Sequence, residues 1–226
     1  MIRTLVISML MATLVIAAPL CAQERTLPPV DEGASDSSWA AFKKRLMTAI
    51  EKKDKQFLLS ILDPKVRSQD ERARGVATFR NQWEVDAADT PVWRELANAL
   101  AIGSAYVKRG DKAPRELCAP YVLGHWPGEF APSTHAVAIG RDTLVQAEPS
   151  STSASLGKLA YDIVPVTDWE VDDKADPKQK WVRIRYKQRD GYVPEELLRS
   201  PIEHAACFVK GPNGWRMIAL APAGGE

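Results

Sequence analysis

The sequence predicts an α+β fold, in which an N-terminal α-helical subdomain is followed by a β-rich region and a C-terminal β-hairpin. Between residues 37 and 103, apolar side chains recur every three or four positions, as on the buried face of a helix. From residue 135 onward, short runs rich in valine and isoleucine alternate with turn residues, as in β-sheets. We therefore expect a helical subdomain at 37–132, a β region at 133–200 and a hairpin at 201–226.

Four helices are expected in the first subdomain, and capping residues precede three of them, Ser37 or Ser38, Asp54 and Thr90. The four helices cover residues 37–53, 54–62, 75–83 and 90–103. Four of the seven tryptophans fall on apolar faces of helices or of the last hairpin and are expected to pack in the interior. They are Trp39, Trp83, Trp93 and Trp215.

Residues 1–22 read as a secretory signal peptide, because one basic residue is followed by an apolar run too short to span a bilayer and then by small residues. Lipidation at Cys21 is the alternative, but Leu20 stands where lipoprotein processing prefers a small side chain. Residues 23–36 mix prolines, acidic and small residues without periodicity, which predicts a flexible linker. The protein is therefore expected to be secreted or periplasmic.

The charge balance argues against nucleic acid and anionic membranes as partners. The 30 basic and 29 acidic residues give a net charge of +1, and loss of Arg3 with the signal would leave a neutral chain. No segment after the signal is long and apolar enough for a transmembrane anchor, so none is expected after cleavage.

Cys118 and Cys207 are the two cysteines that remain after signal cleavage, and an exported chain more often pairs such residues than leaves them free. A Cys118–Cys207 disulfide is expected. Two alternatives remain. Cys118 could act as a nucleophile with His125 or His204, or both cysteines and both histidines could hold zinc, although the spacing from Cys118 to His125 is not typical of a zinc site.

Several short segments of the β region share the pattern of a known domain family. They are Leu144–Ser151, Leu156–Leu159, Trp181–Ile184, Gly191–Val193 and Leu197. With these segments the β region resembles the bacterial SH3-like (SH3b) domain, a small barrel often attached to exported cell-envelope proteins. The sequence departs from the family pattern at Gln146, where an arginine is usual, and in a longer, more acidic stretch at 166–180. The resemblance implies a small SH3-like β-barrel at 133–200 and a partner in the cell envelope, such as a cell-wall peptide, a glycan or a protein. The whole arrangement is also similar to uncharacterised exported proteins of proteobacteria.

The C-terminal segment Phe208–Ile218 resembles the closing hairpin of cystatin-like folds. If it has that role, the β region would be an insertion in a larger α+β domain, and the disulfide would tie the hairpin to residues 115–121. Otherwise the hairpin would complete the barrel.

A binding surface is expected around Trp181, because strand alternation places Val182, Ile184 and Tyr186 on one face and Trp181 with Arg183 on the other. If the aliphatic face is the core, Trp181 is partly exposed. Further aromatic side chains could extend the groove by stacking on a peptide or glycan, although each could equally cover the barrel core. They are Trp169, Tyr161 and Tyr192.

The sequence offers no motif for catalysis or cofactor binding. Gly-x-Ser-x-Gly and glycine-rich phosphate loops are absent, and the acidic run around Asp172, Asp173 and Asp176 reads as a solvated loop. We therefore expect a non-enzymatic envelope protein without a cofactor or metal. The alternatives are a hydrolase or transferase with its site in the helical or cystatin-like part, and a pure protein-interaction or inhibitor role.

Overall fold

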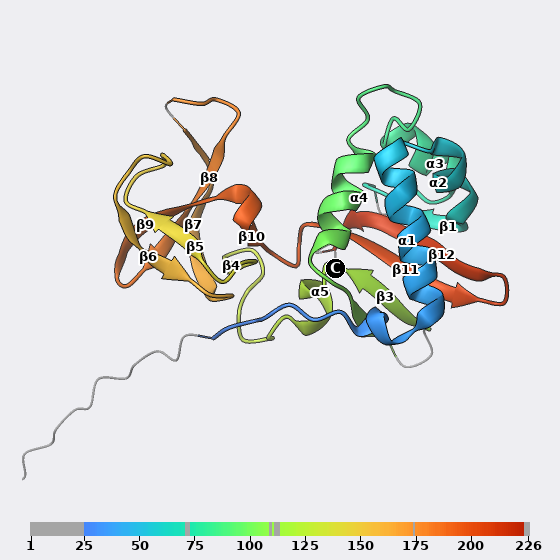
Figure 1. The fold of residues 1–226 in the computed structure, drawn as a ribbon, viewed down its shortest axis with the longest axis horizontal. Coiled ribbons are helices and arrows are strands. Elements are labelled where there is room, and N and C mark those ends of the chain that lie inside the picture. Colours follow the sequence, from blue (N-terminus) through green and yellow to red (C-terminus); the bar gives the residue numbers. More distant parts are fainter. Residues whose placement is uncertain (1–24, 71–72, 109, 111–113, 174, 224–226) are drawn as a thin grey trace, which may run out of the picture.

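The computed structural model describes residues 25–70, 73–108, 110, 114–173 and 175–223, and it has two lobes (Figure 1). The helical lobe (residues 33–125 and 204–222) combines helices with a five-stranded sheet. The strand lobe (residues 135–199) holds a seven-stranded sheet. The mixed α+β class is therefore confirmed. The predicted signal peptide and Cys21 lie outside the described residues.

The first two helices of the helical lobe begin at aspartate caps, the first at Asp36 and not at the expected Ser37 or Ser38, the second at Asp54 as expected. The Asp36 carboxylate accepts hydrogen bonds from the backbone N–H groups of Ser38 and Trp39, at 2.8 and 3.3 Å. Asp54 caps the second helix in the same way. The helices are η1 (Glu32–Ser35), α1 (Ser37–Lys52), α2 (Lys55–Ile61), α3 (Val76–Gln82), α4 (Val92–Ala101) and α5 (Val122–His125).

The first subdomain is not purely helical as predicted, because it supplies three strands of a sheet. These are β1 (Leu62–Arg67), β2 (Ala105–Lys108) and β3 (Arg115–Ala119). The C-terminal hairpin supplies the other two, β11 (His204–Gly211) and β12 (Gly214–Pro222), and the sheet order is β1-β12-β11-β3-β2. The hairpin thus belongs to the helical lobe, and the strand lobe is an insertion between β3 and β11.

The core of this lobe lies between the helices and one face of the sheet. Trp39 is 1% exposed, and its ring centroid lies 4.9 Å from that of Phe208 on β11 and 5.0 Å from that of Trp215 on β12. Trp83 and Trp93 are also buried, so the packing role predicted for all four tryptophans is confirmed. On the opposite sheet face, Cys118 and Cys207 form a small apolar cluster with Ala219.

The strand lobe is built from antiparallel neighbours in the order β10-β4-β7-β8-β9-β5-β6. Its elements are β4 (His135–Ala138), β5 (Thr143–Gln146), β6 (Ser155–Leu159), β7 (Ile163–Asp172), β8 (Lys180–Tyr186), β9 (Arg189–Pro194), η2 (Glu195–Leu197) and β10 (Leu198–Arg199). Val182, Ile184 and Tyr186 enter its core, as the alternation predicts. No pairing among the described residues joins the edge strands β6 and β10, so a closed barrel is not found, and the SH3-like character stays a prediction.

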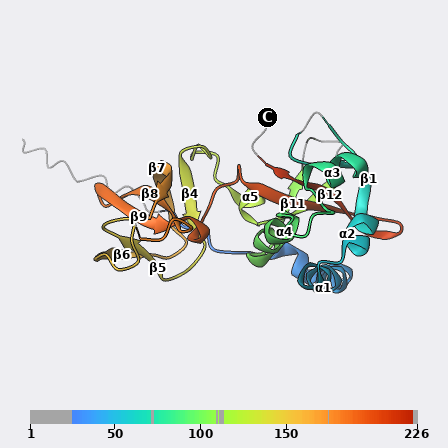
Figure 2. The ribbon, with the colours of Figure 1, turned by 90° about the horizontal axis from the view of Figure 1, so that it is seen from above.

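The stretch predicted as a flexible linker differs from that expectation in its described part. Residues 25–32, here called the strap, run from the strand lobe to the helical lobe along one side of the molecule (Figures 1 and 2). The strap pairs with the strand lobe through a bridge between Thr26 and Asp162, and it is bonded to the helical lobe through Glu32. Its order comes from long-range contacts, which local composition does not reveal.

Within the described residues, no helix has the length and apolarity required to cross a membrane.

Candidate functional site: a cleft between the lobes

A cleft of about 770 Å³ lies where α4 of the helical lobe faces β8, η2 and β10 of the strand lobe. Residues from the connection between β10 and β11 (200–203), and His204 at the start of β11, also contribute to its lining. Its volume is within the range of small-molecule and peptide sites, and an interface between two structural units is a frequent position for such sites.

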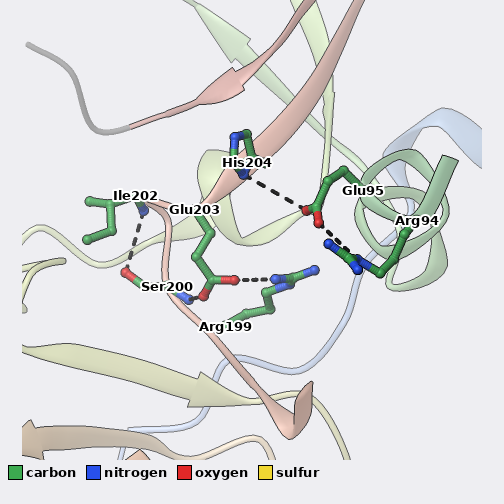
Figure 3. Close-up of polar contacts among 7 residues, drawn as sticks. All are labelled: Arg94, Glu95, Arg199, Ser200, Ile202, Glu203 and His204. Carbon is green, nitrogen blue, oxygen red and sulfur yellow. Dashed lines mark hydrogen bonds and ion pairs between the residues drawn. The ribbon is translucent and has the colours of Figure 1, made fainter. Parts of the chain in front are cut away.

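The connection beneath the cleft is fixed by side-chain hydrogen bonds (Figure 3). The Glu203 carboxylate accepts from the Ser200 backbone N–H at 2.6 Å and pairs with the guanidinium of Arg199. The Ser200 hydroxyl donates to the Pro132 carbonyl oxygen at 2.7 Å. Because these bonds hold the chain at the crossing between lobes, the polar side chains of the connection have defined positions.

His204 and Glu95 bring an imidazole and a carboxylate to the helical side of the cleft, with 3.9 Å between His204 Nδ1 and Glu95 Oε2 (Figure 3). The His204 ring also contacts Trp83 edge-on, at a centroid distance of 5.2 Å. Burial lowers the pKa of His204 below its ordinary value of 6.5, although the carboxylates of Glu95 and Glu203 act in the opposite direction. His204 is therefore mainly neutral at pH 7.

Glu195 gives the strand side of the cleft an unpaired negative charge. Burial raises the pKa of Glu195 above 4.5, and the carboxylates of Glu203, Glu170 and Glu196 add to that shift. Within the described part of the chain, the Glu195 carboxylate has no hydrogen-bond or ion-pair partner. The neighbouring Glu196 accepts a hydrogen bond from the neutral amide of Gln179, at 3.0 Å.

Basic and apolar side chains complete the lining. Arg94 is 72% exposed and lies 3.4 Å from the Glu95 carboxylate, and Lys178 is exposed without an ion-pair partner among the described residues. Ile202 is 36% exposed, which makes it one of two large apolar side chains that stand open to solvent in the described structure. The cleft therefore offers both signs of charge beside an apolar surface.

Ser200, His204 and Glu95 are the residue types of a hydrolase triad, but their geometry differs from one. A serine nucleophile needs its hydroxyl within hydrogen-bond reach of the base. The Ser200 side chain is buried, donates to Pro132 and receives a weak 3.5 Å contact from the Ile202 N–H. No hydrogen bond between Ser200 and His204 is present in the described residues, so this arrangement does not activate Ser200.

Trp181, the expected centre of the binding surface, is buried and not partly exposed. It is 1% exposed, and its indole N–H donates to the Asp173 carboxylate at 3.0 Å. The acidic loop after β7 is not simply solvated as expected, because Asp173 also accepts from the N–H groups of Ala175 and Asp176 and folds the loop over the indole. Strand alternation gave the correct face for Trp181 but could not show that a loop covers that face.

The other four expected binding residues lie at three different places. Trp169 lines the cleft, and its indole N–H donates to the Ser133 carbonyl oxygen at 3.2 Å. Arg183 and Tyr192 are opposite each other on β8 and β9, and Arg183 pairs with Asp168 at 3.2 Å. Tyr161 lies beside the strap. The structure thus brings one of the five, Trp169, into the cleft.

The predicted disulfide is confirmed. Cys118 and Cys207 stand opposite each other on β3 and β11 and are bonded. Glu116 lies near both sulfur atoms, but neither histidine of the zinc alternative joins this group. His125 pairs with Glu32 and His204 lies beside Glu95. The bonded sulfurs are unavailable both for zinc and for nucleophilic attack.

Sequence reasoning missed most of the cleft, because its residues come from segments far apart in the chain. Glu95 and Arg94 look like the solvent face of a helix, and Glu195 and Glu196 look like a surface turn. His204 had been considered only with the cysteines. Its position at the start of a strand that crosses back to the helical lobe is the feature that could have drawn attention to it.

Comparison with protein-family models, with curated proteins and with solved structures found no match to this chain.

Proposed function

We propose that the protein is an exported, non-enzymatic binding protein of the cell envelope and that a cell-wall peptide, with or without its glycan, is held in the cleft between the lobes. The observation that carries the proposal is the composition of the cleft, which combines an unpaired carboxylate at Glu195, an accessible guanidinium at Arg94 and the apolar side chain of Ile202.

Cell-wall peptides carry free amines, free carboxylates and short apolar side chains. An amine fits beside Glu195, whose carboxylate lies near those of Glu203, Glu170 and Glu196. A ligand carboxylate fits beside Arg94 or Lys178. Trp169 and Ile202, which also line the cleft, supply apolar contact. The whole ligand is recognised by both lobes, which favours a flexible, charged peptide over a purely apolar molecule.

The signal peptide and the SH3-like resemblance support the same location. Residues 1–22 would direct the chain out of the cytosol, and the buried disulfide is the kind of bond that persists in an oxidising compartment. The SH3-like family is common in exported envelope proteins. In this proposal the strand lobe supplies one wall of the site through β8, η2 and β10.

Calorimetric titration of the protein with soluble peptidoglycan fragments tests the proposal. The matched pair of variants is Asn98→Trp, which fills the cleft from an exposed position of α4, and Glu51→Trp, which adds the same ring to an exposed position of α1. We expect Asn98→Trp to abolish binding and Glu51→Trp to leave it unchanged. Equal binding by both variants, or no binding by the unmodified protein, contradicts a wall ligand in the cleft. Binding of an envelope protein instead would make the occupant a protein segment.

A hydrolase is the second candidate, because His204 and Glu195 both have shifted pKa values and line one cleft. In that role His204 would serve as a neutral base at pH 7, and Glu195, whose pKa is raised by burial, would be the second ionisable group of the site. Product analysis after incubation with the same fragments distinguishes the two functions. Cleavage that is lost in both His204→Gln and Glu195→Gln favours the hydrolase, and recovery of intact fragments favours the binding protein.

A further inference from the structure

The strap has three sets of contacts, and each set joins a different part of the molecule. At its start, the Arg25 carbonyl oxygen accepts from the Ile163 N–H, and the Leu27 N–H donates to the Tyr161 carbonyl oxygen, both at 2.8 Å. Arg25 also pairs with Glu129 at 2.6 Å, on the connection between the lobes. The start of the strap is therefore joined by an isolated β-bridge to the residues at the beginning of β7.

The end of the strap is bonded to the helical lobe by its two acidic side chains. Asp31 accepts a hydrogen bond from the Ser104 hydroxyl and lies 3.2 Å from the Lys43 ammonium. Glu32 accepts from the Tyr106 backbone N–H at 2.6 Å, and its other carboxylate oxygen lies 3.1 Å from His125 Nε2. The Tyr106 N–H lowers the pKa of Glu32 most, and His125 contributes to the same shift.

The middle of the strap packs into an apolar cluster that both lobes share. Leu27 and Val30 contact a buried group in which Ala105, Tyr121 and Val122 belong to the helical lobe and Val137 and Ile163 to the strand lobe. The Tyr121 hydroxyl donates to the Leu27 carbonyl oxygen. Separating the lobes would therefore expose apolar surface and break strap bonds together.

The wall of the cleft formed by α4 is connected to the strap by direct contact. Ile102, which follows α4, lines the cleft and also packs on the shared cluster. Beside it, Gly103 has φ = +88°, and a Cβ atom there would lie 2.1 Å from the Val30 carbonyl oxygen. The strap backbone thus lies directly against the end of α4, at a distance that only glycine permits.

The opposite wall is connected through the sheet. The strap bonds to Ile163, which pairs with Val137 on β4, and Val137 pairs in turn with Arg199 on β10. Arg199 lines the cleft. In Figure 1 the strap runs along the lower edge of the molecule, whereas α4 and β8 lie above it. The strap therefore links the two lobes from below α4 and β8 in this view.

We propose that the strap is a clasp that sets the spacing between α4 and β10 and so positions the two walls of the cleft. Leu27, Asp31 and Glu32 are positioning residues in this account, and Gly103 allows the clasp to lie against α4. The effect of the strap on the spacing between the two walls does not depend on a ligand. Only the statement that the cleft binds a ligand rests on the proposed function. When the clasp is released, the lobes stay linked by residues 126–134 and 200–203, but their spacing is no longer fixed.

Cutting the strap after folding tests the clasp on a protein whose folded state is established before cleavage. A recognition sequence for a specific protease is inserted between the exposed Pro28 and Pro29 of the full mature chain, and the same preparation is measured before and after cleavage. We expect the cut protein to show a larger maximum dimension in small-angle X-ray scattering and to lose hydrogen-exchange protection at the Ile163 amide. An unchanged scattering curve with full protection at Ile163 overturns the proposal.

A pair of substitutions provides a second, independent test of the clasp. Leu27→Asp places a charge in the shared apolar cluster, whereas Ala34→Asp adds the same charge at an exposed position of η1. Leu27→Asp is expected to reproduce the scattering change of the cut protein, and Ala34→Asp to match the unmodified protein. Because neither measurement uses a ligand, a fixed spacing in the cut protein counts against the clasp alone, and a failure to bind wall fragments counts against the proposed function alone.

Discussion

Cys118 and Cys207 stand opposite each other on neighbouring strands and form a disulfide, although 89 positions separate them in sequence. The whole strand lobe lies within that interval. The bond therefore ties together the two places where the chain leaves and re-enters the sheet of the helical lobe, and it closes a long loop.

Loss of this disulfide is expected to destabilise the protein strongly. For a loop of this length the chain-entropy estimate is about 4 kcal/mol, so the double variant Cys118→Ala/Cys207→Ala should show a free energy of unfolding lower by about that amount. Urea unfolding of the variant and of the unmodified protein, each without reductant, measures the difference. Equal midpoints would mean that the bond adds no stability to the folded chain.

Trp181 is expected to act through stability and not through ligand contact. Trp181→Ala, which removes this buried indole, should lower the free energy of unfolding by about 3–5 kcal/mol, and Trp181→Phe should lower it by less. Trp169 is partly exposed in the cleft, so Trp169→Ala should weaken wall-peptide binding more than Trp181→Phe does. Thermal unfolding and calorimetry on the two variants separate these roles. A binding loss in Trp181→Phe with unchanged unfolding would restore Trp181 as a contact residue.

Asp173 should make stability depend on pH in the acid range. The Ala175 N–H and the Trp181 indole lower the pKa of Asp173 below its ordinary value of 3.8. A lowered carboxyl pKa gives stability that is complete above about 3.8 and is lost as the pH falls through the folded-state pKa. Thermal midpoints measured from pH 6 to pH 2 should fall less steeply for Asp173→Asn than for the unmodified protein. Parallel curves would exclude this contribution.

His204 should add a second pH dependence near neutrality. Burial lowers its pKa, so the folded protein binds fewer protons at His204 than the unfolded chain does. Stability from this group is complete above about 6.5 and is lost as the pH falls from there through the lower, folded-state pKa. The ring-proton resonances of His204 should titrate with a midpoint below 6.5, and Glu95→Gln should lower the midpoint further by removing a nearby negative charge. A midpoint above 6.5 would contradict the burial argument.

Local features of the fold could be predicted from the sequence, because neighbouring residues determine them. The cap at Asp54 and the core face of Val182 and Ile184 follow from spacing alone. The strands β1, β2 and β3 were missed, since they are short and β1 contains Pro64 at the sheet edge, where a proline is tolerated.

The cleft and the strap could not be predicted, because both are made by contacts between distant segments. Glu95 and Glu195 are 100 positions apart, and nothing in their local sequence indicates that they line one cavity. The prolines and acidic residues of the strap are typical of a linker, yet Glu32 is bonded to Tyr106 and His125. The pairing of Cys118 with Cys207 is the long-range contact that was predicted, because cysteine count and expected compartment restrict the choice to one pair.

The central claim is that a cell-wall peptide occupies the cleft between the lobes. The most direct measurement is an NMR titration of isotopically labelled mature protein with soluble peptidoglycan fragments. The account predicts saturable shifts at the Asn98 amide, the Trp169 indole and the Gln179 side-chain amide, with little change at Tyr192 and Arg183. Shifts confined to Tyr192 and Arg183, or no shifts at saturating fragment, would contradict it.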